Sequence, residues 1–159
     1  MGKRTARYIV LVSIVLMAVS LFFDGEAFAV CSGSPFINRF LYHFFHASFL
    51  HYAINAWCLL SIAFTFEITV ADLVVGFLGA SLIPITWQTP TIGLSGLCFV
   101  LFGRFSYCVQ KKLKYHFYIG ACIALGLLMP GVNGVIHLFC YAVGLVYGLL
   151  ITPFQWKMR

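Results

Sequence analysis

Long apolar runs, separated by short polar or basic segments, make up most of this chain. The runs predict helices over about residues 8–23, 40–66, 73–87, 94–110, 115–129 and 135–151. A helix needs about 20 apolar residues to cross a bilayer core of about 30 Å. Runs of this length leave little chain for a separate soluble domain. The pattern therefore predicts one all-α membrane domain over residues 1–159, built as a bundle of six transmembrane helices.

The composition changes this picture little, because it also points to lipid as the main solvent. Of the 159 residues, 62% are hydrophobic and only 9% are charged, whereas about a quarter of the residues in a soluble domain are charged. The mean hydropathy is +1.00. We therefore expect a multi-pass integral membrane protein, and the short loops favour a bacterial inner membrane.

The net charge of +6 is concentrated in three places. Basic residues lie at the N-terminus, after the fourth apolar run and at the C-terminus: Lys3, Arg4, Arg7, Lys111, Lys112, Lys114, Lys157 and Arg159. Cytoplasmic loops of membrane proteins are enriched in Lys and Arg. This placement predicts that both termini face the cytoplasm, and it argues against nucleic acid as the partner. Arg104 lies inside the fourth run, and we expect its side chain to snorkel to the same surface.

Two further features bear on processing and cofactors. Ala27-Phe28-Ala29 follows the first apolar run and resembles a signal-peptidase site. Cleavage there is an alternative, but the nearby Asp24 and Glu26 favour an uncleaved first helix. Five of the six cysteines lie in apolar runs, and no CxxC or Cys/His metal spacing occurs. We therefore expect no metal and no cofactor.

A serine flanked by glycines, in Gly93-Leu94-Ser95-Gly96, begins the fourth run. This run is short, so Ser95 should lie within the membrane at a helix N-terminus. Free backbone N–H groups and the positive end of the helix dipole would favour a developing oxyanion there. Ser95, Phe99 and Gly103 recur every four residues and share one helix face. Gly103 would let another backbone approach that face.

The sixth run offers a histidine at the end of a stripe of small residues. His137, Cys140 and Gly144 fall at helical spacing, and small residues allow membrane helices to pack closely. If this stripe meets the face of Ser95, the histidine can act as general base and then general acid. Taken separately, Ser95 and His137 could each be ordinary interhelical packing or hydrogen-bonding residues.

The second run adds polar groups that could complete such a site. His51 and Asn55 are four residues apart on one helix face, and both can donate hydrogen bonds, as an oxyanion hole requires. They could instead be plain interhelical hydrogen bonders. His46 lies nearer the outer surface. We expect His43 to serve a loop-side or interfacial role and His116 to be solvated.

At these motifs the chain resembles the rhomboid family of intramembrane serine proteases. The family carries His-x4-His-x3-Asn on its second helix, Gly-x-Ser-Gly on its fourth, and a histidine followed by small residues on its sixth. The matching residues, in that order, are His46, His51, Asn55, Gly93, Ser95, Gly96, His137, Cys140 and Gly144, with Gly103 at a recurring downstream position. The resemblance covers nearly the whole chain.

The resemblance implies a serine endopeptidase that cleaves transmembrane segments of other membrane proteins. Ser95 would be the nucleophile and His137 its base, in a dyad without an acidic third member. The Ser95 backbone N–H, His51 and Asn55 would form the oxyanion hole. His46 would be structural, and the reaction would use no cofactor.

The chain departs from the family pattern around the expected contact of the fourth and sixth helices. Phe99 stands where the family often has a tyrosine that packs on the catalytic histidine. Ile136 and the pair Phe139-Cys140 stand where small residues are common. These changes remove no catalytic group, so we expect an active enzyme.

Three rival functions share parts of this pattern. The main alternative is a catalytically inactive rhomboid-like protein that binds membrane clients, although such relatives usually lose the serine or the histidine. A haem or electron-transfer protein would use histidines as axial ligands, but here they cluster on one helix. A channel or transporter would need charged groups within the membrane, and only Arg104 lies well inside a predicted helix.

Overall fold

The computed structural model describes residues 2–84, 90–129 and 131–156, with side chains to residue 151, and most of these residues are helical. The α-helices are α1 (Lys3–Ser20), α2 (Asn38–Leu41), α3 (Phe49–Thr65), α4 (Val70–Ser81), α5 (Ser95–Phe105), α6 (Lys112–Leu128) and α7 (Gly134–Trp156). Short 3-10 helices are η1 (Glu26–Phe28), η2 (Tyr42–Phe44) and η3 (Ser106–Cys108). One isolated antiparallel bridge joins Val30 and Thr91.

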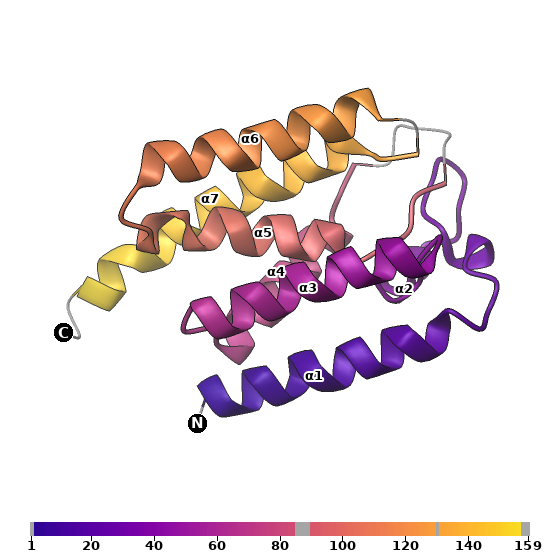
Figure 1. The fold of residues 1–159 in the computed structure, drawn as a ribbon, viewed down its shortest axis with the longest axis horizontal. Coiled ribbons are helices and arrows are strands. Elements are labelled where there is room, and N and C mark those ends of the chain that lie inside the picture. The colour runs from indigo at the N-terminus through magenta and orange to yellow at the C-terminus, as the bar shows by residue number, and fades with distance from the viewer. Residues whose placement is uncertain (1, 85–89, 130, 157–159) are drawn as a thin grey trace.

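The central helix of the bundle is α5 (Figure 1). It makes its most extensive contact with α7 and also packs against α3 and α4, while α1 packs on α3 and α6 on α7. Both α5 and α7 start at the end of the bundle that carries the long loops, on the right in Figure 1. The start of α1 and the end of α7 lie at the opposite end. Because α5 and α7 run in parallel, their first residues come together.

Glycines set the close approach of α5 and α7. A Cβ atom on Gly144 would collide with the backbone carbonyl of Val100, and one on Gly103 would collide with that of Tyr141. A Cβ atom on Gly148 would lie 2.8 Å from the Arg104 carbonyl oxygen. Any side chain at these positions would push the two helices apart, as expected for close packing through small residues.

The predicted six-span bundle is wrong. Among the described residues, one helical stretch, Gly134–Ile151 of α7, is long and apolar enough to cross a membrane, or two if a bent helix pair counts as one span. Apart from the four-residue α2, the shortest α-helices are α4, with 12 residues, and α5, with 11. At 1.5 Å per residue they extend only about 16–18 Å.

Two further predicted spans are not among these stretches, and both of their helices begin with basic residues. Helix α1 has 18 residues but begins with Lys3, Arg4 and Arg7. Helix α6 has 17 residues and begins with Lys112 and Lys114. The apolar runs therefore overstated the length of apolar helix, because helix ends and basic first turns fall within or beside them.

The predicted helix over residues 40–66 is broken. Its two parts, Asn38–Phe44 and Phe49–Thr65, meet at 93°. Phe45 has extended backbone, with φ −103° and ψ 151°, and the Ser48 side chain caps α3 by accepting a hydrogen bond from the His51 N–H. His46 consequently lies in the bend and not on the same helix as His51.

Other helix bounds also shift. The prediction over residues 73–87 corresponds to α4, which begins earlier because Thr69 and Asp72 form a reciprocal capping box, and which ends at Ser81. Residues 85–87 of that prediction lie outside the described residues. The prediction over 94–110 ends as α-helix at Phe105, and that over 135–151 continues to Trp156.

Three side chains expected near a surface or in solvent have partners on other helices, and two of them, Arg104 and His43, are buried. Arg104 does not snorkel, because its Nε lies 3.1 Å from Asp72 Oδ1 and both side chains are 2% exposed. His43 is buried, with Nε2 3.0 Å from Ser81 Oγ. His116 Nδ1 lies 2.6 Å from the Tyr141 hydroxyl. Each found its partner on another helix, which local spacing does not reveal.

Candidate active site

Ser95 and His137 meet at the loop end of the bundle. Ser95 is the first residue of α5, and His137 lies in the first turn of α7. His137 Nε2 lies 2.9 Å from Ser95 Oγ, and both residues are half-buried. This is the distance of a hydrogen bond between a hydroxyl and an imidazole, the arrangement that activates a serine.

Phe99 and Gly126 also lie against the imidazole of His137. The Phe99 ring, one turn along α5 from Ser95, stacks on it with a centroid distance of 4.3 Å and an angle of 16°. The other ring nitrogen, Nδ1, is buried and has no hydrogen-bond partner among the described residues. It faces Gly126 of α6, where a Cβ atom would lie 3.3 Å from it. Ser95 and His137 therefore stand as a pair without a third side chain.

His51 and Asn55 converge on Gly93, two residues before Ser95. A Cβ atom on Gly93 would lie 2.7 Å from His51 Nε2 and 3.4 Å from Asn55 Nδ2. Gly93 has φ +120° and donates its N–H to the Tyr42 carbonyl at 2.8 Å. Both the backbone conformation and the lack of room require glycine there. The α3 side chains thus reach the backbone that leads directly into the serine.

The two converging side chains offer donors on their free atoms. Asn55 is 4% exposed, and its Nδ2 has no hydrogen-bond partner among the described residues. The Ala47 N–H donates to His51 Nδ1 at 3.4 Å. This bond leaves the proton of a neutral imidazole on Nε2, the atom nearer Gly93. An N–H from each residue is therefore available beside the Ser95 backbone.

The other residues predicted near the site fall into two groups. His46 is buried in the bend before α3, with its ring centroid 5.1 Å from that of His51. Gly96 packs behind the serine, where a Cβ atom would lie 3.3 Å from Cys140 Sγ. Gly103 and Gly144 are not brought to the site. They lie farther along the α5–α7 contact.

Sequence reasoning missed two residues that shape the site. Tyr42 accepts the Gly93 N–H and donates its hydroxyl to the Ala80 carbonyl at 2.8 Å. Gly126 lies beside His137 Nδ1. No spacing along the chain links either residue to Ser95. The bend that displaces His46 had a usable signal, because a serine before an apolar helical run, here Ser48, is a common N-cap.

Comparisons with protein-family models, with curated proteins and with solved structures find no match to this chain. The functional argument therefore rests on the three motifs and on the placement of their residues. Among the described residues, no group of three or more His, Cys, Asp and Glu side chains could hold a metal ion. The groups at the candidate site are a serine hydroxyl, an imidazole and the neutral hydrogen-bond donors of His51 and Asn55.

Proposed function

We propose that this chain is a serine endopeptidase that cleaves segments of membrane proteins, with Ser95 as nucleophile and His137 as its base. The observation that carries the proposal is the 2.9 Å contact between Ser95 Oγ and His137 Nε2 at the starts of two parallel helices. The proposal takes from the rhomboid resemblance the chemistry of the three motifs. It leaves out the six-span architecture.

In the first step Ser95 Oγ attacks the carbonyl carbon of the scissile peptide. His137 Nε2 accepts the hydroxyl proton, which requires the neutral imidazole to carry its own proton on Nδ1. Negative charge develops on the carbonyl oxygen. In the proposed mechanism it is stabilised by Asn55 Nδ2, His51 Nε2 and the Ser95 backbone N–H, which has no acceptor in the first helical turn. One such donor is worth about 10²–10³ in rate.

In the second step His137 gives the proton to the leaving amine, and the acyl group remains on Ser95. His137 then removes a proton from water, which attacks the ester carbonyl. The bond between the acyl group and Ser95 Oγ breaks, the acid product leaves, and His137 returns the proton to Ser95 Oγ. The imidazole keeps its orientation because Phe99 stacks on it. No acidic residue takes part, in keeping with the lack of a partner at Nδ1 among the described residues.

The surface of the bundle supports a location in lipid. Large apolar side chains are exposed on α3, α6 and α7, including Trp57 at 73%, Phe117 at 70% and Leu138 at 53%. A monomeric protein in water rarely exposes so many large apolar side chains. We place α7 across the bilayer of a bacterial inner membrane, with the shorter helices beside it in lipid. The substrate would be a membrane segment of another protein.

Labelling with a fluorophosphonate, which reacts with activated serines, tests the proposal. We expect detergent-purified protein to be labelled, and Ser95→Ala and His137→Ala to abolish labelling. The control is Ser106→Ala at the other end of α5, where the hydroxyl only donates to the Gly103 carbonyl at 2.8 Å, and it should label normally. If folded protein in detergent and in liposomes is never labelled, the catalytically inactive, client-binding alternative replaces the proposal.

A further inference from the structure

The four acidic residues of this chain have two different kinds of surroundings. Glu67 pairs with Lys3 at 2.6 Å, and Asp72 pairs with Arg104 at 3.1 Å. Asp24 and Glu26 have no cationic partner among the described residues. The two residues share one local hydrogen bond, in which the Glu26 N–H donates to Asp24 Oδ1 at 2.9 Å. Two carboxylates are therefore left for a partner outside the chain.

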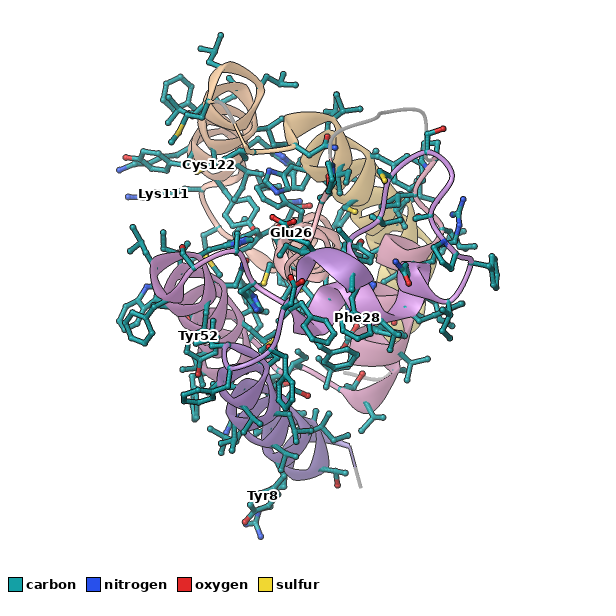
Figure 2. All side chains as sticks on the ribbon, turned by 90° about the vertical axis from the view of Figure 1, so that its right-hand side faces the viewer. Tyr8, Glu26, Phe28, Tyr52, Lys111 and Cys122 are labelled. Atoms are coloured by element: carbon teal, nitrogen blue, oxygen red, sulfur yellow. The ribbon has the colours of Figure 1, made fainter. Side chains whose placement is uncertain are left out.

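Both carboxylates line a cavity of about 500 Å³ at the loop end of the bundle. One wall is the segment after α1, another is the bend before α3, and a third is the strand-like segment that leads to Ser95 through Ile92. Figure 2 views this end and shows Glu26 near its centre, with Phe28 beside it. Neither Ser95 nor His137 lines the cavity, so it adjoins the site without containing it.

A buried polar side chain in the cavity wall is the second observation. His46 lines the cavity, is only 7% exposed, and has no hydrogen-bond partner on either ring nitrogen among the described residues. An unpaired buried polar group is unfavourable unless a partner binds to it. The same ring contacts His51, with centroids 5.1 Å apart. His46 thereby links the cavity to the donors beside Gly93.

The loop that carries the carboxylates is fixed to the bundle. The Phe28 ring stacks on Phe45 with a centroid distance of 4.1 Å and an angle of 7°. Asn38 Nδ2 donates to the carbonyls of Ala27 at 3.1 Å and Ala29 at 2.9 Å. A pre-ordered loop loses little conformational freedom when a ligand binds.

We infer that this cavity binds a basic side chain, Lys or Arg, of the polypeptide substrate, within a few residues of the bond that is cleaved. Asp24 and Glu26 would pair with the cation, and a ring nitrogen of His46 would accept one of its hydrogen bonds. Leu21 and Phe23 in the walls suit the aliphatic stem. The distance from the scissile bond follows from Ile92, which lines the cavity and directly precedes Gly93, because an extended chain advances about 3.3 Å per residue.

This inference rests on the proposed function, and a charge scan of a substrate tests it. The test substrate is a synthetic apolar helical peptide with a fluorophore and quencher, in detergent micelles, whose cut is located by mass spectrometry. Each of the residues flanking the cut is changed in turn to Lys or to Gln. We expect Lys to exceed Gln at one position by about 5-fold in kcat/KM, the scale of an exposed ion pair, and less at high salt.

The protein variant Asp24→Asn/Glu26→Gln should abolish this preference while fluorophosphonate labelling stays normal. The matched control is Glu67→Gln, which removes an acidic group at the other end of the bundle and should keep the preference. Equal rates for Lys and Gln at every position, in a protein that is labelled, would overturn the inference and leave the proposed function standing.

A binding measurement separates the two proposals if no peptide is cut. Fluorescence anisotropy of a labelled Ala-Ala-Lys-Ala-Ala peptide, with the Gln peptide as control, is measured on the Ser95→Ala variant. Tighter binding of the Lys peptide that is lost in the Asp24→Asn/Glu26→Gln background supports the cavity assignment even where serine labelling fails. No difference between the two peptides contradicts it.

Discussion

A polar cluster lies at each end of the contact between α5 and α7. The two clusters differ in how many of their polar atoms have hydrogen-bond partners. At one end Arg104, Asp72 and Tyr147 form a closed cluster. Arg104 Nε lies 3.1 Å from Asp72 Oδ1, and the Tyr147 hydroxyl donates to the same oxygen at 3.2 Å. At the other end Ser95 and His137 are half-buried, and among the described residues their side chains are hydrogen-bonded only to each other.

The difference distinguishes polar groups that stabilise the fold from polar groups that are free to bind another molecule. Among the described residues, every buried side-chain nitrogen or oxygen without a partner belongs to His43, His46, Asn55 or His137. Leaving such a group unpaired costs about 1–3 kcal/mol. A group that binds at the Ser95 end could offset this cost by pairing with the free donor or acceptor. The Arg104 cluster ties three helices together, whereas the Ser95 end keeps its capacity to bind.

The largest expected effect comes from opening the closed cluster with Arg104→Met. This change leaves the Asp72 carboxylate buried without its cation, and we expect the free energy of unfolding in detergent to fall by about 3–5 kcal/mol. The double variant Arg104→Met/Asp72→Asn should recover most of this loss, because no buried charge remains and the Asn side chain can still cap α4.

The control for that variant is Lys3→Met. It breaks the Lys3–Glu67 pair, whose side chains are 55% and 67% exposed, and should cost less than about 1 kcal/mol. If Arg104→Met and Lys3→Met destabilise the protein equally, the Arg104 cluster does not hold the three helices together. That result would contradict the assignment of a stabilising role to the Arg104 cluster.

The second effect concerns the open end and has the opposite signature. Asn55→Ala should lower kcat by about 10²–10³, as loss of one oxyanion donor does. The unfolding free energy should stay unchanged or rise, because the variant removes a buried amide nitrogen that has no partner among the described residues. Steady-state kinetics and detergent unfolding of the same preparation give both quantities.

Ser61→Ala is the matched control on the same helix, because Ser61 is exposed on α3 away from Gly93. It should change neither kcat nor stability. An Asn55→Ala protein that unfolds more easily but turns over normally would make Asn55 a packing residue. That outcome would remove the main donor from the proposed oxyanion hole.

The sequence carried the helical class and the spacing within helices, because both depend on nearby residues. Four-residue spacing is sufficient to place His51 and Asn55 on the same side of α3. It does not show where a helix stops. Ser48 and the Thr69–Asp72 box begin helices inside or beside continuous apolar runs. Counting apolar residues across those points gave six spans, whereas the described residues contain one or two helical stretches long and apolar enough to cross a membrane.

Contacts between distant segments were the other limit. Arg104 was expected at a surface because its partner Asp72 lies on another helix, 32 residues away. Tyr42 supports Gly93 through its backbone carbonyl, a group that every residue possesses and that no sequence pattern marks. Helix pairing decides these positions, and the only pairing signal in the sequence was the stripe of small residues shared by α5 and α7.

The smallest effect distinguishes a side chain that orients the base from one that only fills space. Phe99 stacks on His137, and an aromatic pair contributes about 0.5–1.5 kcal/mol beyond buried area. Phe99→Leu should therefore lower kcat/KM by about 2- to 12-fold, while Phe99→Tyr, which keeps the ring, should stay close to the wild type.

The control Phe102→Leu removes the ring that meets Phe99 edge-on at 5.8 Å and should affect stability more than kcat/KM. If both leucine variants lower kcat/KM equally, the ring at position 99 acts through packing of α5 alone, and the orientation of His137 must come from its bond to Ser95.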